Sequence, residues 1–492
     1  MTKALERKMD KAKSYKEWRT AAIAHDEQSG LAKWKKKDET RRYDYATIRR
    51  RVNLMKSLRR ADDNHGLLFA LNEGIHGNLG GMGRSDLYQQ AKFGTKRLIE
   101  EYSKEVSRCL EHIAKPRLKG VSLEEKIDFF HRAEICFGHS AFMMSGSGTF
   151  LFFHIGVLKT LWEQDLIPEI ISGSSGGALI AAIAGSRDNS ELGRVFEPKF
   201  IDLELDLTTI INKLSLIGKS KIDQEDFRNT IAKVIPDITF TEAYEISGLR
   251  INISIAPAEK HQKSRLLNAI TAPNVMLREA VLASCCIPGV FEPVTLMAKD
   301  VNGEKVPYLS SRRWVDGSLS DDLPMKRLSR LYGVNHFIVS QTNPLALPFI
   351  KPEKKRPGVI STLTATSMKT IKDWGLAASY IAQRQFNSDS SFSKLINGYI
   401  SIVSQSYTGD ITILPSNRFL NPTKALSAQS SKEILELIAD GEKSTWPSVE
   451  KIRIQTHIGK TLNKFVKKLD RDVINKSKRV EKDKGLKVVK RA

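Results

Sequence analysis

The first part of the chain carries apolar residues at helical spacing. One set falls on a single helix face: Tyr45, Ile48, Val52 and Met55. Ser14 with Glu17, and Ser122 with Glu125, have the spacing of a capping box, in which the serine and glutamate side chains satisfy free amides at a helix start. We therefore predict a helical N-terminal domain over residues 1–135.

From residue 136 the pattern changes, because short apolar runs alternate with helical stretches. Strand, helix, strand and helix are predicted in turn at residues 140–146, 149–164, 167–172 and 177–185. Further strands are predicted at residues 250–257, 312–318 and 335–341. Strands that alternate with helices form a parallel sheet covered by those helices. The prediction is an α/β domain over residues 136–345.

Beyond residue 345 the chain becomes mixed and basic. We predict a C-terminal extension over residues 346–492 that ends in a basic helical tail. Within it, the apolar side chains of residues 458–469 fall near one helix face, with lysines elsewhere. Such a helix either lies in a lipid interface or docks on the protein's own core, and the sequence leaves both open.

The composition of the 492-residue chain restricts its partners. A formal net charge of +22 favours an anionic partner. The basic residues are interspersed with acidic ones and form no zinc-finger, RNP or helix-turn-helix signature, so nucleic acid is the least supported partner. No run of 18 apolar residues occurs, so any membrane contact is expected to be peripheral. Four cysteines without metal-binding spacing and the lack of an apolar leader favour a cytoplasmic protein that is not secreted.

The segment Gly173–Gly177 matches the pattern G-x-S-x-G, with Ser175 at its centre. A serine on a tight turn between a strand and a helix exposes its hydroxyl, and small residues on both sides avoid clashes. Here an apolar strand precedes the serine and a small-residue helix follows it. The pattern predicts Ser175 as a nucleophile, Gly173 and Gly177 as the required small residues, and Ser174 as a spacer. A structural turn in a core is the alternative.

A second glycine-containing loop, residues 146–148, lies between the first predicted strand and its helix. Such a loop can direct backbone N–H groups at an anion, as in a phosphate site or an oxyanion hole. The Gly-Lys-Ser/Thr ending of a Walker loop is missing here, and the loop precedes the serine strand, as oxyanion loops often do.

A nucleophilic serine needs a base, and Asp316 is the candidate. It ends a predicted strand and precedes Gly317, so its carboxylate could stand at the same sheet edge as Ser175. The alternative is that it only caps a turn. Asp321 and Asp322 are expected to cap a helix or to be solvated.

These features together resemble the patatin-like phospholipase family, and more closely its plant and fungal triacylglycerol lipases. The resemblance spans roughly residues 14–455. It is carried by seven segments: residues 15–30, 43–48, 78–88, 95–102, 152–183, 283–294 and 312–344. The first four are similar to the helical domain that those lipases carry before the patatin domain.

The resemblance implies a patatin-like three-layer α/β/α sandwich with a mostly parallel sheet. It also implies hydrolysis of long-chain acyl esters, of triacylglycerol or phospholipid, at a membrane or lipid-droplet surface, without a metal or cofactor. A Ser-Asp dyad would do the chemistry, with Ser175 as nucleophile and Asp316 as base. The oxyanion hole would consist of backbone amides from four residues: Gly146, Ser147, Gly148 and Gly176.

This sequence departs from the family's glycine loop at two positions. Ser147 and Leu151 stand where the family has glycine. If residue 147 requires a positive φ, a serine there costs about 1 kcal/mol and weakens the oxyanion hole.

Two other functions stay open. A Ser-Asp-His esterase would add His336 or His457 to Ser175 and Asp316, in the chain order of an α/β-hydrolase. A lipid-surface binding protein with an impaired site is the second alternative.

Overall fold

The computed structural model describes residues 2–197, 224–259, 262–287, 291–344, 346–347, 350, 407–417 and 429–489. The chain packs as two compact units. Unit 1 contains residues 1–139 and 449–492, and unit 2 contains residues 140–448. Within the described ranges, no helix has the length and apolar character needed to cross a bilayer.

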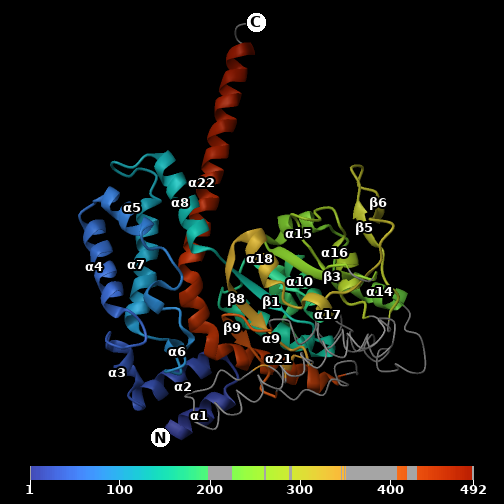
Figure 1. The fold of residues 1–492 in the computed structure, drawn as a ribbon, viewed down its shortest axis with the longest axis horizontal. Coiled ribbons are helices and arrows are strands. Elements are labelled where there is room, and N and C mark those ends of the chain that lie inside the picture. The colour runs from blue at the N-terminus through green and yellow to red at the C-terminus, as the bar shows by residue number, and fades with distance from the viewer. Residues whose placement is uncertain are drawn as a thin grey trace, which may run out of the picture. The chain divides into compact units, whose positions relative to one another are not determined.

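Unit 1 is helical, as predicted for its N-terminal part (Figure 1). Its helices are α1 (Thr2–Lys11), α2 (Tyr15–Gln28), α3 (Leu31–Lys36), α4 (Tyr45–Arg60), α5 (Asn64–Asn72), α6 (Ser85–Tyr88), α7 (Arg97–Ile113), α8 (Leu123–Phe137) and α22 (Val449–Val489). Ser122 and Glu125 form both hydrogen bonds of the predicted capping box at the start of α8. At α2, the Ser14 side chain accepts a hydrogen bond from the backbone amide of Glu17.

The long helix α22 packs on α7 and α8 inside unit 1, and Figure 1 shows the three helices side by side. The face that the sequence singled out is buried in the unit 1 core through Ile458, Leu462, Phe465, Val466 and Leu469. For residues 458–469, docking on the protein's own core is therefore confirmed, and the interfacial alternative is wrong. Helix α22 therefore contributes to the same hydrophobic core as α4, α7 and α8.

Replacing the fully buried Leu462 by alanine is expected to destabilise unit 1 by about 2–5 kcal/mol, because a cavity would remain in the core. Urea unfolding followed by circular dichroism measures the change. The matched control is Lys468→Ala on the exposed side of α22, where about 0.5 kcal/mol or less is expected. Equal effects of the two substitutions would contradict the packing of α22.

Unit 2 contains a seven-stranded, mostly parallel sheet. Its strands are β1 (His139–Met144), β2 (Ile170–Gly173), β3 (Arg250–Pro257), β4 (Arg265–Leu267), β7 (Trp314–Asp316), β8 (Val334–Ser340) and β9 (Ile411–Ile413). The order is β4-β3-β2-β1-β8-β9, and β7 also pairs with β3. The pairs β1–β2, β2–β3 and β8–β9 are parallel, whereas β4 and β7 run antiparallel to β3. A separate hairpin is formed by β5 (Leu296–Lys299) and β6 (Lys305–Tyr308).

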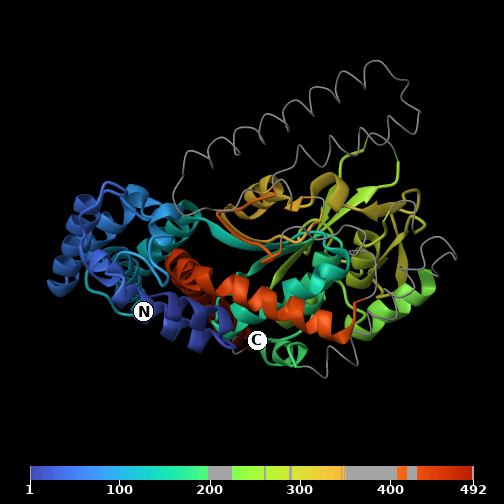
Figure 2. The same ribbon diagram turned by 90° about the horizontal axis from the view of Figure 1, so that it is seen from below.

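Helices cover both faces of this sheet, so the predicted layered α/β fold is confirmed (Figure 2). They are α9 (Leu151–Glu163), α10 (Gly176–Gly185), α11 (Asn189–Val195), α14 (Gln224–Val234), α15 (Phe240–Ser247), α16 (Leu277–Ser284), α17 (Ser318–Asp321), α18 (Met325–Tyr332) and α21 (Ser431–Thr445). In Figure 2, α9 and α21 lie on one side of the sheet and α18 on the other. Every residue of α10 is buried, which explains its run of small and aliphatic side chains.

The residues predicted as a C-terminal extension, 346–492, are shared between the two units. In unit 2 the backbones of α21 and α9 approach each other closely at Gly156. A Cβ at this position would lie 2.0 Å from the carbonyl oxygen of Ile438, so only glycine fits there. Helix α22 belongs to unit 1. Residues 351–406 and 418–428 of the extension lie outside the described residues.

Candidate active site

Ser175 occupies a strained turn between β2 and α10. Its backbone has φ 52° and ψ −124°. Residues other than glycine seldom adopt a positive φ. The neighbouring glycines are required by space: a Cβ at Gly173 would lie 2.2 Å from the carbonyl oxygen of Gly177, and a Cβ at Gly177 would lie 2.4 Å from that of Met144. The geometry is that of the turn the sequence predicts.

A serine that the sequence analysis did not single out holds this turn in place. The Ser175 backbone amide donates a hydrogen bond of 2.9 Å to the Ser284 hydroxyl at the end of α16. That hydroxyl donates in turn to the Ser254 carbonyl of β3, at 2.8 Å. Ser284 is fully buried and lies 109 residues from Ser175 in sequence, so no local pattern could have indicated this contact.

Asp316 ends β7 and is buried beside Ser175. Its carboxylate accepts a hydrogen bond of 2.7 Å from the Ser318 amide. Burial raises the pKa of Asp316 to about 6, against hydrogen bonds from Ser318 and from the Ser175 side chain that lower it. Gly317 keeps this end of β7 close to β3, because a Cβ there would lie 2.6 Å from the carbonyl carbon of Ser254. The fold thus brings together the two side chains that the sequence predicted to meet.

The glycine loop lies against the start of α10. A Cβ at Gly176 would lie 2.3 Å from the Ser147 hydroxyl oxygen, 3.0 Å from the Gly148 carbonyl and 3.1 Å from the Leu151 Cβ. Gly148 has φ +53°, whereas Ser147 has φ −140°. The serine that departs from the family pattern therefore does not occupy the left-handed conformation, and its expected cost does not arise.

The four predicted oxyanion donors divide into two groups. Three amides, those of Ser147, Gly148 and Gly176, donate to no acceptor among the described residues. The fourth, that of Gly146, donates a hydrogen bond of 2.7 Å to a carboxylate oxygen of Asp322. The Gly146 amide is therefore occupied by the protein itself.

Asp322 is fully buried, so the expectation that it is solvated is wrong. Its second carboxylate oxygen accepts a hydrogen bond of 3.0 Å from the Asn343 side chain, and its backbone carbonyl accepts one of 2.9 Å from the Ser174 hydroxyl. Asp322 thereby joins the glycine loop to the serine turn. Burial raises the pKa of its carboxyl group to about 7, the Gly146 and Asn343 hydrogen bonds lower it, and the nearby Asp316 raises it further.

Asp322 makes the stability of unit 2 depend on pH. The folded state holds the proton up to about pH 7, whereas the unfolded chain loses it near pH 4, so stability falls as the pH rises between these values. Asp322→Asn removes this titration. We subtract the unfolding free energy of the unmodified chain from that of Asp322→Asn. This difference is expected to be about 2–4 kcal/mol larger at pH 8 than at pH 4.5, because only the unmodified chain loses stability as the pH rises. Urea unfolding at both pH values tests this, and a difference independent of pH would contradict it.

A buried histidine fixes the other end of the glycine loop. His154 of α9 has no exposed surface; its Nε2 lies 3.0 Å from the Ser145 carbonyl oxygen and its Nδ1 lies 2.7 Å from the Ser340 hydroxyl. Burial lowers the pKa of this imidazole to about 4, so the ring is neutral at physiological pH and Nε2–H can donate to Ser145. The sequence analysis missed His154, since an apolar helix gives no sign that a histidine within it has a partner.

The two histidines proposed for a triad lie elsewhere. His336 is near the beginning of β8, where its Nδ1 lies 3.0 Å from the Ser140 hydroxyl at the beginning of β1. The glycine loop follows the opposite end of β1, on the order of 10 Å or more away. His457 belongs to α22 in unit 1. No cluster of potential metal ligands occurs among the described residues.

Comparison with known proteins gives the family. Residues 142–328 match the patatin-like phospholipase family, and residues 1–134 match a domain of unknown function, DUF3336. Triacylglycerol lipase ptl3 of Schizosaccharomyces pombe is 33% identical over 90% of this chain and 92% of its own length. The chain belongs to the patatin-like phospholipase family.

Other relatives of this patatin-like chain are longer. Triacylglycerol lipase 4 of Saccharomyces cerevisiae is 35% identical over 91% of this chain and 51% of its own. Triacylglycerol lipase SDP1L of Arabidopsis thaliana is 31% identical over 94% of this chain and 60% of its own. The chain thus spans about half the length of the first curated relatives it matches. Among solved structures, VipD from Legionella pneumophila aligns over 61% of this chain and 67% of its own, at 12% identity and a TM-score of 0.29.

Proposed function

We propose that the patatin-like chain hydrolyses acyl esters of lipids, with Ser175 as nucleophile and Asp316 as base. The observation that supports the proposal is a serine on a strained strand-to-helix turn beside a buried aspartate, whose pKa burial raises to about 6. An ordinary aspartate, with a pKa near 4, is a poor base for a hydroxyl. Burial makes this carboxylate a stronger base.

The reaction would proceed through an acyl-enzyme. The Ser175 oxygen forms a bond to the acyl carbonyl carbon while its proton passes to the Asp316 carboxylate. The tetrahedral intermediate collapses as the ester C–O bond breaks, and Asp316 returns the proton to the departing alcohol. Water then attacks the acyl-enzyme, Asp316 accepts a proton from it, and the fatty acid leaves as the Ser175 hydroxyl is restored.

The oxyanion would be held by the amides of Ser147, Gly148 and Gly176. These three amides are the predicted donors that make no hydrogen bond among the described residues. The Gly176 amide also lies at the N-terminus of α10, the positive end of the helix dipole. Gly146 takes a different part in this proposal, because its amide anchors the loop to Asp322. His154 supports the same loop through Ser145.

The substrate class rests on the relatives. Several are named triacylglycerol lipases and the family is named for phospholipases, so long-chain acylglycerols and phospholipids are the esters to test. We also propose that the protein acts from the cytoplasm as a peripheral protein at a membrane or lipid-droplet surface. A net charge of +22 favours an anionic surface.

A panel of emulsified esters tests the proposal: triacylglycerol, diacylglycerol, phosphatidylcholine, lysophosphatidylcholine and steryl ester. We expect fatty acid release from at least one of them, and covalent labelling of Ser175 by a fluorophosphonate, located by mass spectrometry. His336→Ala is expected to leave the rate unchanged, and abolished hydrolysis in that folded variant would favour a triad. Lipid binding with neither hydrolysis nor labelling would favour an impaired binding protein.

A further inference from the structure

The C-terminal end of α16 contacts both residues of the proposed dyad. Helix α16 packs on β3, on β7, which ends at Asp316, and on α10, which follows Ser175. Its last residue, Ser284, accepts the hydrogen bond from the Ser175 amide. Two residues later, the carbonyl of Cys286 accepts a hydrogen bond of 2.9 Å from the Asp316 amide. One short segment of the chain therefore holds the backbone of the nucleophile and that of the base.

The neighbours of the Ser284 hydroxyl fix both of its roles. An amide only donates and a carbonyl only accepts, so the hydroxyl accepts from Ser175 at 2.9 Å and donates to Ser254 at 2.8 Å. A serine in a helix commonly donates to the carbonyl four residues before it, whereas Ser284 bonds outside its own helix. Ser284 has no exposed surface and Ser254 is 1% exposed, so bulk water does not replace a lost hydroxyl.

This contact fixes the direction of the Ser175 side chain. The peptide group before Ser175 is held by Ser284. The peptide group after it belongs to the start of α10, where the Ser175 carbonyl accepts hydrogen bonds from the amides of Ala178 and Leu179. Because both planar groups are held, the bond from Cα to Cβ has one direction, and φ stays at 52°, a value that serine seldom adopts.

The acceptor of the Ser284 hydroxyl lies in a firmly held part of the sheet. Ser254 belongs to the middle of β3, which pairs with β4 along one edge and with β2 and β7 along the other. Gly317, next to the proposed base, packs on the same peptide group, because a Cβ there would lie 2.6 Å from the Ser254 carbonyl oxygen. The Ser254 carbonyl is therefore a common anchor for the serine turn and for the end of β7.

The two cysteines of this segment do not compete with Ser175 as nucleophiles. Burial and the nearby Asp316 raise the pKa of the Cys285 thiol well above its usual range. The same two causes raise the pKa of the Cys286 thiol to about 12, and its sulfur lies 2.8 Å from the Glu292 carbonyl oxygen. Both thiols stay protonated at physiological pH, and a thiol is a far weaker nucleophile than a thiolate. The contribution of this segment to the site is geometric.

We infer that Ser284 is a positioning residue, whose hydroxyl holds the Ser175 backbone in the conformation from which the serine oxygen meets both Asp316 and an ester carbonyl. This role rests on the proposed function. Ser284 acts through the Ser175 amide and not on the reacting oxygen. Its loss should slow the attack by Ser175 while the binding of substrate and the titration of the base stay the same.

Ser284→Ala in the full chain tests this role with a soluble ester such as p-nitrophenyl butyrate. We expect kcat to fall by about 10- to 100-fold, because a small displacement of a reacting group has an effect of this size, and KM to change less than twofold. Fluorophosphonate labelling of Ser175 should slow by the same factor, since it needs the same attack. The inflection near pH 6 should persist, because Asp316 keeps its contacts with Ser318 and Cys286. A purely structural role would lower stability to urea and leave kcat of the folded protein unchanged.

Other substitutions at residue 284 test for the hydroxyl itself. Ser284→Thr keeps a hydroxyl and is expected to restore kcat and the labelling rate to within threefold of the unmodified chain. Ser284→Cys carries a weaker hydrogen-bond acceptor, so an intermediate loss of about three- to tenfold is expected. The cysteine variant serves for the comparison if either of the other two does not fold.

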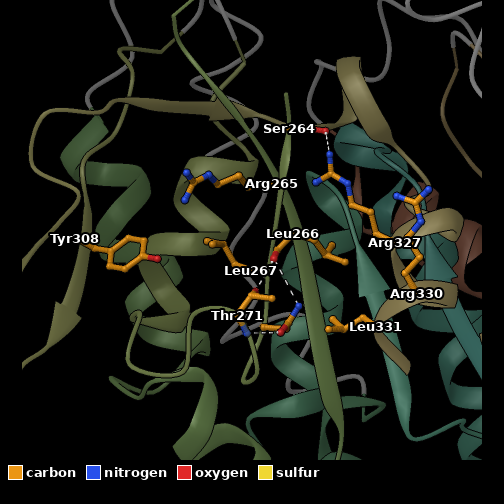
Figure 3. Close-up of a pocket in the computed structure, with 10 residues that line it drawn as sticks. Ser264, Arg265, Leu266, Leu267, Thr271, Tyr308, Arg327, Arg330 and Leu331 are labelled. Carbon is orange, nitrogen blue, oxygen red and sulfur yellow. Dashed lines mark hydrogen bonds between the residues drawn. The ribbon is translucent and has the colours of Figure 1, made fainter. Parts of the chain in front are cut away.

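Two control variants remove hydroxyls that also bond strand carbonyls of unit 2. Ser329→Ala removes a donor to the Val334 carbonyl, 2.7 Å away at the beginning of β8. Thr271→Ala removes a donor to the Leu266 carbonyl, 2.9 Å away on β4, beside the pocket drawn in Figure 3. Neither hydroxyl bonds Ser175, so kcat and the labelling rate are expected to change less than twofold.

The inference is overturned if folded Ser284→Ala keeps more than half of the unmodified kcat and labelling rate, or if a control variant loses as much as Ser284→Ala. It is also overturned if the folded threonine variant is as slow as the alanine variant. A loss in Ser284→Ala that threonine restores supports it. Failure of the proposed function is recognised separately, because Ser175→Ala would then hydrolyse esters at the unmodified rate.

Discussion

Replacement of Ser175 by alanine is expected to slow ester hydrolysis by about 10⁴-fold or more. The substitution removes the oxygen that forms the acyl-enzyme, and water would have to attack the ester directly within the same oxyanion hole. The backbone contacts of the turn are unaffected, because the Ser284 hydroxyl bonds the amide of residue 175 and not its side chain. The rate is measured on the best substrate of the ester panel.

The matched control is Ser172→Ala, three residues earlier on β2. The Ser172 hydroxyl is buried and has no hydrogen-bond partner among the described residues, so the substitution removes a serine hydroxyl near the turn without breaking a contact. Its activity and its fluorophosphonate labelling should match those of the unmodified chain. Fatty acid release by Ser175→Ala at the unmodified rate would refute the assignment of the nucleophile.

Asp316→Asn is expected to lower kcat by about 10³- to 10⁴-fold. The amide keeps the size of the carboxylate and can still accept a hydrogen bond from Ser318, but it cannot take the proton of Ser175. Asp321→Asn is a suitable control, because that nearby carboxylate pairs with Arg327 and not with the serine. A comparable loss in both variants would indicate a general effect of charge in this region.

The pH dependence of the reaction follows from the same residue. Asp316 acts as a base only when ionised, and its pKa is raised to about 6. Activity should therefore fall about tenfold for each pH unit below 6 and level off above it. The residual activity of Asp316→Asn should lack this inflection. An inflection near pH 4 in the unmodified chain would mean that burial does not tune the carboxylate.

The serine turn could be predicted from sequence because its determinants are local. Five consecutive residues, a preceding apolar strand and a following small-residue helix specify the strained conformation at Ser175, and the structure shows it. The short strands β4 and β9 were not predicted, because three residues are too few to show alternation and, unlike β7, neither lies within a longer predicted run. Each of them pairs with the edge of a longer strand, β4 with β3 and β9 with β8.

The roles of Asp322 and Gly146 could not be predicted for a different reason. An aspartate before a proline-containing helix start normally caps that helix in solvent, and nothing near Asp322 indicates that it is buried. Its partner Gly146 is 176 residues away in sequence. The two residues meet only because the assembled sheet brings the segments that follow β1 and β7 together. For the same reason the sequence could not show that one of the four predicted oxyanion amides is already bound.

The position of α22 has a consequence for how the chain is made. The core of unit 1 needs residues at both ends of the sequence, with the 309 residues of unit 2 between them. At translation rates of about 5–20 residues per second, synthesis of α22 begins roughly 15–60 s after the N-terminal helices have been made. During that time Leu110, Phe130 and their neighbours have no partner for one face. The nascent N-terminal segment is therefore a natural client for chaperones until α22 has been synthesised.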